Sequence, residues 1–195
     1  YNVIIMTGYS YGDLSTGTVE AVKSWVREGG TLITMKQAVS WANQQGLASV
    51  EYVRPDRGES PETRPYVQQG ADNGAEVIGG TIFNAQLDLT HPLAYGYNQS
   101  LIRVFRNSTM FLKKGQNPYS TPLYYTDDPL ASGYVSETNE EAIKGTAAIV
   151  VSRAGRGKVI AMTDNPNFRA FWYGTNKLFA NAIFFGQTIS GSTGN

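Results

Sequence analysis

The sequence predicts an α/β fold with a doubly wound, mostly parallel sheet and an antiparallel elaboration around residues 76–134. Three observations lead to this class. The N-terminal part alternates short apolar runs with amphipathic stretches, in the order strand, helix, strand, helix. Regular alternation returns in the C-terminal part of the chain. Between these two parts, short strand-like segments are separated by Gly, Pro and Asn turns.

The first two strand–helix pairs follow from apolar periodicity and from residues that end helices. In chain order they are a strand over 3–6, a helix that Gly29-Gly30 ends, a strand over 31–34 and a helix over about 37–45. Residues 3–6 are continuously apolar, which is typical of a strand covered on both faces. Thr16 or Thr18 is expected to cap the first helix.

The middle of the chain has shorter signals. Residues 52–74 are polar, contain prolines and show no period, so they predict a long loop. Strands are then predicted at 81–87, 101–105 and 122–125. The pair Asp127-Asp128 precedes a proline, which indicates an ordinary turn and not a calcium site.

The C-terminal part predicts a helix over 137–144, strands over 147–151 and 158–162, and a last helix over about 168–185 with a broad apolar face. The Gly-Arg-Gly sequence around Arg156 is too short for a dinucleotide-binding loop, and it indicates a hairpin turn between the two strands. Residues 190–195 predict a flexible tail, so a single domain is expected to span 1–189.

Composition excludes several functions. Sixteen basic residues balance sixteen acidic ones without a basic run, so no nucleic-acid partner is expected. The absence of cysteine excludes disulfides, thiolate metal sites and cysteine nucleophiles. No apolar run reaches the roughly 18 residues that cross a bilayer, so no membrane insertion is expected.

Catalytic and metal-ligating patterns are not found either. The single histidine, His91, lies before a proline and has Ala94 where a zinc motif would place an acid. We expect its imidazole to pack or bond within a local turn. The sequence therefore predicts no catalytic residue, no metal site and no cofactor in this chain.

Polar residues gather just after the predicted strands. The stretch GGTLITMKQAVSWA places Met35-Lys36 at a strand-to-helix turn, where many α/β enzymes hold a nucleophile. Ligands of open α/β sheets bind outside the carboxyl ends of the parallel strands. The candidate ligand-binding residues are Tyr9, Lys36, Asp164, Asn165 and Arg169. In the alternative, Asp164 or Asn167 caps the last helix, Arg169 pairs with an acid and Lys36 is solvated.

Three stretches carry a family resemblance. They are GGTIFNAQLDLTHPLAYGY at 79–97, SGY at 132–134 and DNPNFRAFWYGTNKLFANAIFFG at 164–186. They resemble the C-terminal region of large secreted bacterial zinc carboxypeptidase-like proteins, which end in a class I glutamine amidotransferase-like domain of flavodoxin-like fold. The resemblance covers nearly the whole sequence.

The resemblance implies a domain without glutaminase chemistry. The family's cysteine position corresponds to the Met35-Lys36 turn, and Asp164 to Asn167 stands roughly where its His-Pro-Glu element would be. Neither place holds a nucleophile or base. The resemblance also implies that a preceding segment supplies a first strand and helix, that zinc belongs only to an upstream peptidase domain, and that the protein is secreted or periplasmic.

Four functions remain open at this point. The leading hypothesis is a non-catalytic accessory domain of an exported zinc carboxypeptidase-like metallopeptidase, with the upstream peptidase domain of the same protein as its partner. The alternative is a module that binds a small polar or anionic ligand in the strand-end crevice. A hydrolase that pairs Lys36 with Thr34 or Ser40 is a third reading. The fourth is self-association through an exposed sheet edge.

Overall fold

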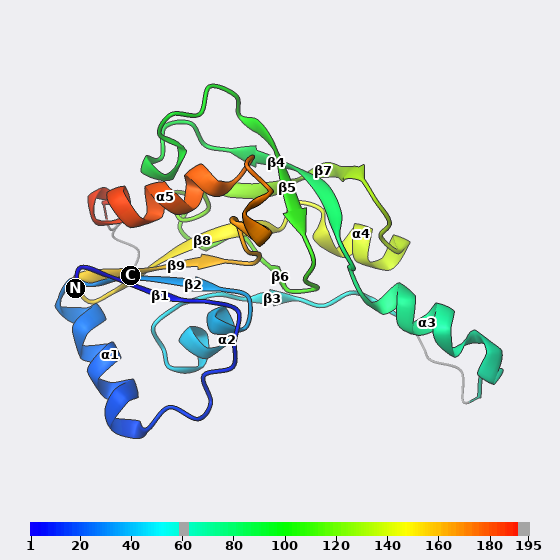
Figure 1. Cartoon of the computed structure of the whole chain (residues 1–195), viewed down its shortest axis with the longest axis horizontal. Helices are drawn as coiled ribbons and strands as arrows, with labels where there is room; N and C mark the ends of the chain where they lie inside the picture. The colour runs from blue at the N-terminus through cyan, green and yellow to red at the C-terminus, as the bar shows by residue number, and fades with distance from the viewer. Residues whose placement is uncertain (59–62, 191–195) are drawn as a thin grey trace.

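The computed structural model describes residues 1–58 and 63–190. Four residues of the predicted long loop, 59–62, and the predicted tail from 191 onward lie outside the described residues. The described strands form a nine-stranded sheet, with α1 and α2 beside its parallel strands, α4 near β7 and α3 extending away from the sheet (Figure 1). Its main order is β1-β2-β9-β8-β7-β4-β5, with β6 beside β8 and β3 beside β6.

The bounds of the elements are as follows. The strands are β1 Val3–Met6, β2 Thr31–Met35, β3 Tyr52–Val53, β4 Thr81–Leu87, β5 Leu101–Arg106, β6 Phe111–Leu112, β7 Leu123–Ser132, β8 Ala147–Ala154 and β9 Gly157–Met162. The helices are α1 Thr16–Glu28, α2 Gln37–Gln44, α3 Gln69–Glu76, α4 Glu137–Ile143 and α5 Asn176–Phe185.

Helices cover both faces of the parallel strands. Val26 of α1 and Ala38 of α2 share one buried cluster with Leu32, whereas Leu178 of α5 packs with Ile33 on the other face (Figure 1). The predicted doubly wound α/β class is therefore confirmed. Only β1, β2 and β9 pair in parallel, and the other described pairings are antiparallel. The antiparallel part thus extends beyond residues 76–134 and includes β8.

Two details at the N-terminus differ from the predictions. Ser15, not Thr16 or Thr18, caps α1, because its Oγ accepts a hydrogen bond from Thr18 N at 3.2 Å. Strand β1 is not fully covered on both faces: it forms an edge of the sheet, and Ile5 is 41% exposed. Its apolar run arises because Val3 packs against one core cluster and Ile4 against the other, so both faces are covered in part. A sequence pattern does not distinguish this partial burial from complete burial.

The predicted long loop contains a helix. Residues 69–76 form α3, which buries none of its residues and includes Gly70 and Gly74. Glycine is unfavourable in helices, so intrinsic propensity gives no helix signal here. An ion pair of 3.0 Å between Arg64 and Asp72 ties this helix to the segment before it.

Strand β7 continues through the predicted turn. Asp127 and Asp128 are exposed and lie within β7. The register between β4 and β7 shifts here: Ala85 pairs with Tyr125 and Phe83 with Leu130, so four residues of β7 lie opposite the single residue Asn84. The turn prediction is therefore wrong, since a β-bulge accommodates the proline that favoured it.

The C-terminal hairpin is confirmed, but the last helix is shorter than predicted. Strands β8 and β9 pair antiparallel up to Ala154 and Gly157. Helix α5 begins at Asn176, not near residue 168. The cause is a left-handed backbone at Arg169 and Ala170, with φ of 48° and 54°, which interrupts a continuous apolar pattern. Among the described residues, none of the helices has the length and apolar character needed to cross a membrane.

Gly157 permits close packing between β9 and α1. A Cβ atom at this position would overlap the carbonyl oxygens of Val26 and Gly30. We expect Gly157→Ala to lower the free energy of unfolding by about 1–3 kcal/mol, because main-chain atoms cannot move aside as a side chain can. Urea denaturation measures this change. Gly70→Ala, where a Cβ meets nothing within 4 Å, serves as the control and should not destabilise; equal effects at the two sites would contradict the packing argument.

Candidate functional site

Lys36 occupies a sharp turn between β2 and α2. The strand ends at Met35, the helix begins at Gln37, and Lys36 between them has φ 51° and ψ −123°. This backbone conformation is strained for a residue with a Cβ atom. Backbone strain of this kind is concentrated at active sites and ligand-binding sites. The stem of Lys36 lies beside Gly8, where an added Cβ would be 3.1 Å from Lys36 Cδ. The turn therefore has the geometry of a nucleophile elbow, with a lysine in the nucleophile's place.

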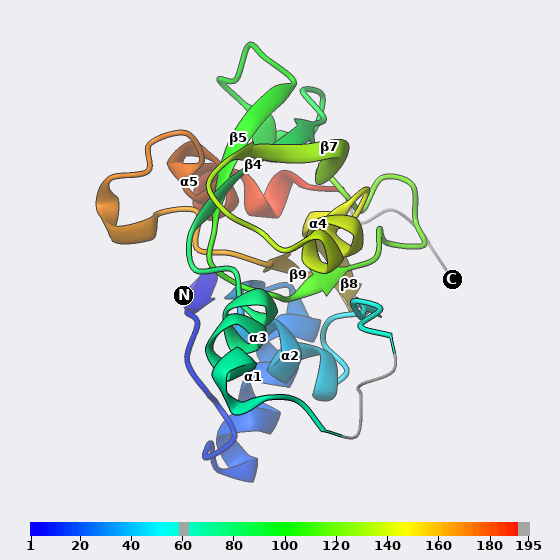
Figure 2. The same ribbon diagram turned by 90° about the vertical axis from the view of Figure 1, so that its right-hand side faces the viewer.

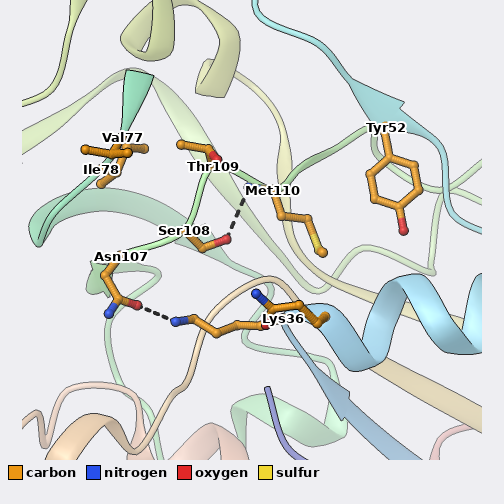
Figure 3. A pocket seen from close by; sticks show the side chains of 9 residues that line it. Lys36, Tyr52, Val77, Ile78, Asn107, Ser108, Thr109 and Met110 are labelled. Atoms are coloured by element: carbon orange, nitrogen blue, oxygen red, sulfur yellow. Dashed lines mark hydrogen bonds between the residues drawn. The ribbon is translucent and has the colours of Figure 1, made fainter. Parts of the chain in front are cut away.

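A pocket of about 420 Å³ opens beside this turn. Its walls come from the start of α2, from β3, from the segment before β4 and from the loop after β5 (Figure 3). The lining residues are Lys36, Gln37, Tyr52, Val77, Ile78, Asn107, Ser108, Thr109 and Met110. The Lys36 amine donates a hydrogen bond of 2.6 Å to Asn107 Oδ1 across the pocket (Figure 3). An ammonium carries three donors, so this contact leaves two for a ligand.

The pocket favours negative charge. Among the described residues that line it, Lys36 is the one charged side chain, and none carries a carboxylate. The N-terminus of α2 begins at the same place without a side-chain cap, so its first N–H groups add positive potential. Hydroxyl groups of Ser108 and Thr109 add neutral hydrogen-bonding capacity, while Val77 and Ile78 provide an apolar wall.

A buried ion pair holds the loop that forms one wall. Arg106, at the end of β5, is fully buried, and its Nη1 donates to Asp164 Oδ2 at 2.7 Å. Asp164 Oδ2 also accepts hydrogen bonds from Tyr125 at 3.0 Å and from Thr163 at 2.8 Å. The same guanidinium donates through Nε to Ser108 O at 2.8 Å and through Nη2 to Met110 O. One charged network thus fixes both the end of β9 and the loop that faces Lys36.

Burial and charge act together on this network. Burial alone would lower the pKa of Arg106, but the charge of Asp164 and the interactions with Tyr125 outweigh it and raise that pKa above its usual value. Burial, followed by the Asp164 charge, raises the pKa of the Tyr125 hydroxyl above its usual value. The guanidinium and the phenol therefore keep their protons, and both donate to Asp164.

The Tyr125 shift makes stability depend on pH in alkaline solution. The unfolded chain loses the Tyr125 proton near its ordinary pKa of about 10, whereas the folded chain retains it. The folded state then binds more protons, so the free energy of unfolding is expected to fall as pH rises above about 10. Urea unfolding at a series of alkaline pH values measures the slope. Tyr125→Phe should flatten it, and an unchanged slope in this variant would contradict the assignment.

The structure places the five predicted site residues in different surroundings. Lys36 lines the 420 Å³ pocket, whereas Asp164 and Asn165 line a separate cavity of about 20 Å³. Tyr9 follows β1 and is 75% exposed. Arg169 is exposed, and its guanidinium lies 5.4 Å from the ring centre of Phe168. The Arg106 network connects Lys36 with Asp164, because Arg106 binds Asp164 and its neighbour Asn107 binds Lys36.

The alternative roles considered for these residues are not observed. Helix α5 has Thr175 at its N-cap position, so neither Asp164 nor Asn167 caps it. Lys36 is partly buried and bonded to Asn107, so it is not simply solvated. Its described hydrogen bond does not involve Thr34 or Ser40, and Ser40 Oγ instead accepts from the Tyr52 hydroxyl at 3.1 Å.

Sequence reasoning missed Arg106 and the 107–110 loop. Strand β5 alternates exposed and buried residues, and Arg106 occupies an inward position of that alternation. An arginine at an inward position indicates a buried partner, since charged side chains are rarely buried alone. That signal was available in the sequence, but it does not identify Asp164 as the partner.

His91 forms the predicted local turn. Its Nδ1 accepts a hydrogen bond from Leu93 N at 3.2 Å, and the ring is buried. Burial lowers its pKa, so the imidazole is neutral at pH 7. Among the described residues, no group of three or more His, Cys, Asp or Glu side chains is positioned to hold a metal ion.

The fold resembles that of class I glutamine amidotransferase-like proteins. A PurQ-like glutamine amidotransferase in the structure of PurLQS from Thermotoga maritima matches 95% of this chain and 80% of its own, with a TM-score of 0.53 and 15% identity. A ThuA-like protein from Bacteroides uniformis ATCC 8492 matches 100% of this chain and 72% of its own, with a TM-score of 0.52 and 13% identity. At these identities the likeness shows the fold alone. No protein-family model and no curated protein sequence matches the chain.

Proposed function

We propose that this domain binds a small organic anion in the pocket beside Lys36 and does not catalyse a reaction there. The observation that carries the proposal is the position of Lys36. A strained elbow directs its amine toward Asn107 across a 420 Å³ pocket whose described lining contains no carboxylate. The volume lies in the range of small-molecule sites, roughly 300–1,000 Å³.

The lining indicates the kind of anion. Lys36 and the first N–H groups of α2 suit a carboxylate or phosphate group. Val77, Ile78 and Met110 suit an apolar part of the same molecule. A small carboxylic acid with an aliphatic or aromatic body fits both walls.

The absence of catalysis is part of the proposal. A lysine occupies the elbow position, and its amine is bonded to an amide that accepts no proton at neutral pH. The buried His91 bonds the backbone of its own turn and does not line the pocket. Both observations support a binding role.

Binding can be tested by ligand-observed NMR with small carboxylic acids and their primary amides. We expect the acids to bind more tightly than the amides, and Lys36→Met to weaken the acids at least about tenfold, as loss of a charged hydrogen bond predicts. Lys144→Met is the matched control, because this lysine pairs with Glu141 on α4, away from the pocket. Equal binding of acids and amides, or unchanged binding in Lys36→Met, would contradict the proposal.

We also propose that the domain acts within a larger exported protein, as an accessory domain of a zinc carboxypeptidase-like metallopeptidase. The motifs at 79–97 and 164–186 support this role, and so does β1, an edge strand with the partly exposed Ile5. The same edge supports pairing with an upstream segment or with a second copy. In this proposal zinc is bound only by the upstream domain.

Immunoblotting of the native protein tests this role. We expect a secreted or periplasmic band much larger than the 21.3 kDa of this chain. A band of about that mass confined to the cytoplasm would contradict the proposal.

Sedimentation of the isolated chain, with Ile5→Lys as the edge-blocking variant, tests self-association through β1.

A further inference from the structure

A second concave site has lining residues that differ from those of the Lys36 pocket. It is a groove of about 700 Å³ between the segment leading into β3, the loop after β6 and strand β8. The described C-terminal end closes it through Ile189 and Ser190. Figure 2 shows the segment leading into β3 beside β8, on the side toward the C-terminus. The two sites share no lining residue, although Glu51 of the groove directly precedes Tyr52 of the Lys36 pocket in the chain.

Hydrogen bonds fix each wall of the groove. Ser49 N donates to Ser152 Oγ at 3.0 Å, and Val151 N donates to Ser120 O at 2.8 Å. The loop after β6 is also tied to the opposite wall, since Lys113 N donates to Glu51 O at 2.8 Å. The floor is therefore β8, and both walls are anchored to it or to each other. Such a groove is formed before any ligand arrives.

Positive charge is concentrated in this groove. Lys113, Lys114, Arg153 and Lys158 line it, against the single carboxylate of Glu51. This imbalance stands out because the chain as a whole has sixteen basic and sixteen acidic residues. Lys158 is buried and donates to the carbonyls of Gln187 and Ile189, so it holds the end wall. Lys114 and Arg153 are exposed. The Lys114 amine lies 3.5 Å from the ring centre of Tyr124, and Arg153 Nε donates to Gly155 O at 2.8 Å, which leaves the Lys114 N–H groups and the terminal Arg153 nitrogens to face a ligand.

The remaining lining groups suit a molecule with many hydroxyls. Glu51 is an acceptor only and forms hydrogen bonds with Lys113 at 2.9 Å and with Gln116 at 3.4 Å. A carboxylate has about four lone-pair sites, so Glu51 can also accept hydrogen bonds from hydroxyl groups of a ligand. The ring of Tyr119 is 76% exposed at the rim and offers an apolar face against which a sugar ring can pack.

We propose that this groove binds an acidic carbohydrate, a short oligomer of uronic acid residues. The ligand's carboxylates face Lys114 and Arg153, its hydroxyls donate to Glu51, and one sugar ring stacks on Tyr119. A ligand that carries both anionic groups and hydroxyl donors satisfies the cations and the carboxylate at once.

Isothermal titration with a galacturonic acid oligomer tests the proposal. We expect binding that Arg153→Ala and Lys114→Ala each weaken about tenfold, since each removes one charged contact. Tyr119→Ala should weaken it by a similar factor, because the stacking face is lost. Arg156→Ala is the matched control: this exposed arginine lies in the hairpin turn three residues from Arg153 and does not line the groove.

Two comparison probes decide between carbohydrate recognition and charge alone. A neutral galactose oligomer should bind at least about tenfold more weakly than the acidic one. An acidic peptide of equal charge should bind weakly and be insensitive to Tyr119→Ala. Equal affinity for the peptide, no binding of the uronic acid oligomer, or an equal loss in Arg156→Ala would overturn the proposal. Lys36→Met should leave this binding unchanged, so the two sites can fail separately.

Discussion

Replacing Arg106 with leucine is expected to lower the free energy of unfolding by about 3–5 kcal/mol, the cost of breaking a buried ion pair from one side. The guanidinium is fully buried and joins Asp164 to the carbonyls of Ser108 and Met110. Leucine fills part of the space, but it leaves the two carbonyls without their donor and the carboxylate with only the neutral donors Tyr125 and Thr163. Asp164 is itself only 7% exposed, so water compensates poorly.

Urea denaturation of three variants tests this expectation. Arg103→Leu is the matched control, because Arg103 lies on the exposed face of the same strand and should change stability by no more than about 0.5 kcal/mol. The double variant Arg106→Leu with Asp164→Leu removes both charges and should recover part of the loss. If Arg106→Leu and Arg103→Leu cost the same, the network does not stabilise the fold as argued.

Some elements of the fold could be predicted from the sequence and others could not. Elements with strong periodicity were predicted correctly, as in β2, α2 and the β8–β9 hairpin, because the local pattern and the tertiary environment agree. Helix α3 was missed because its two glycines and exposed surface give no pattern, and an ion pair from Arg64 to Asp72 helps to hold it. The start of α5 was misplaced because the left-handed backbone at Arg169 leaves no mark in the apolar periodicity.

The site was predicted in part for a similar reason. Lys36 could be found because a strand-to-helix turn can be read along the chain. Its partner Asn107 could not, since β5 lies at the other end of the strand order from β1 and its end reaches the Lys36 turn only in the folded sheet. Asp164 was named for its position after β9, and the structure gives it a different role as the buried partner of Arg106.

Glycine at position 36 is expected to make the protein more stable than alanine at the same position, by about 1–2 kcal/mol. Ordinarily glycine is the less favourable residue, because it gains more freedom in the unfolded chain. At φ 51° and ψ −123° the order reverses, since the Cβ of alanine keeps the strain that glycine releases. Both variants lose the amine and should weaken anion binding by at least about tenfold. The two variants should therefore differ in stability but not in anion binding.

Paired substitutions at Thr175 provide the control for this comparison. Thr175 is also an N-cap residue, but its φ is −119°, so no backbone strain favours glycine there. The cap preference is roughly 1 kcal/mol or less, and because Thr175 is 2% exposed, the buried Cβ of alanine adds packing that favours alanine. The glycine-over-alanine advantage measured by urea denaturation should be clearly larger at position 36 than at position 175. An equal advantage at both positions would mean that the Lys36 turn stores no strain. The elbow would then be an ordinary helix start, and the main structural support for a preorganised anion site would be removed.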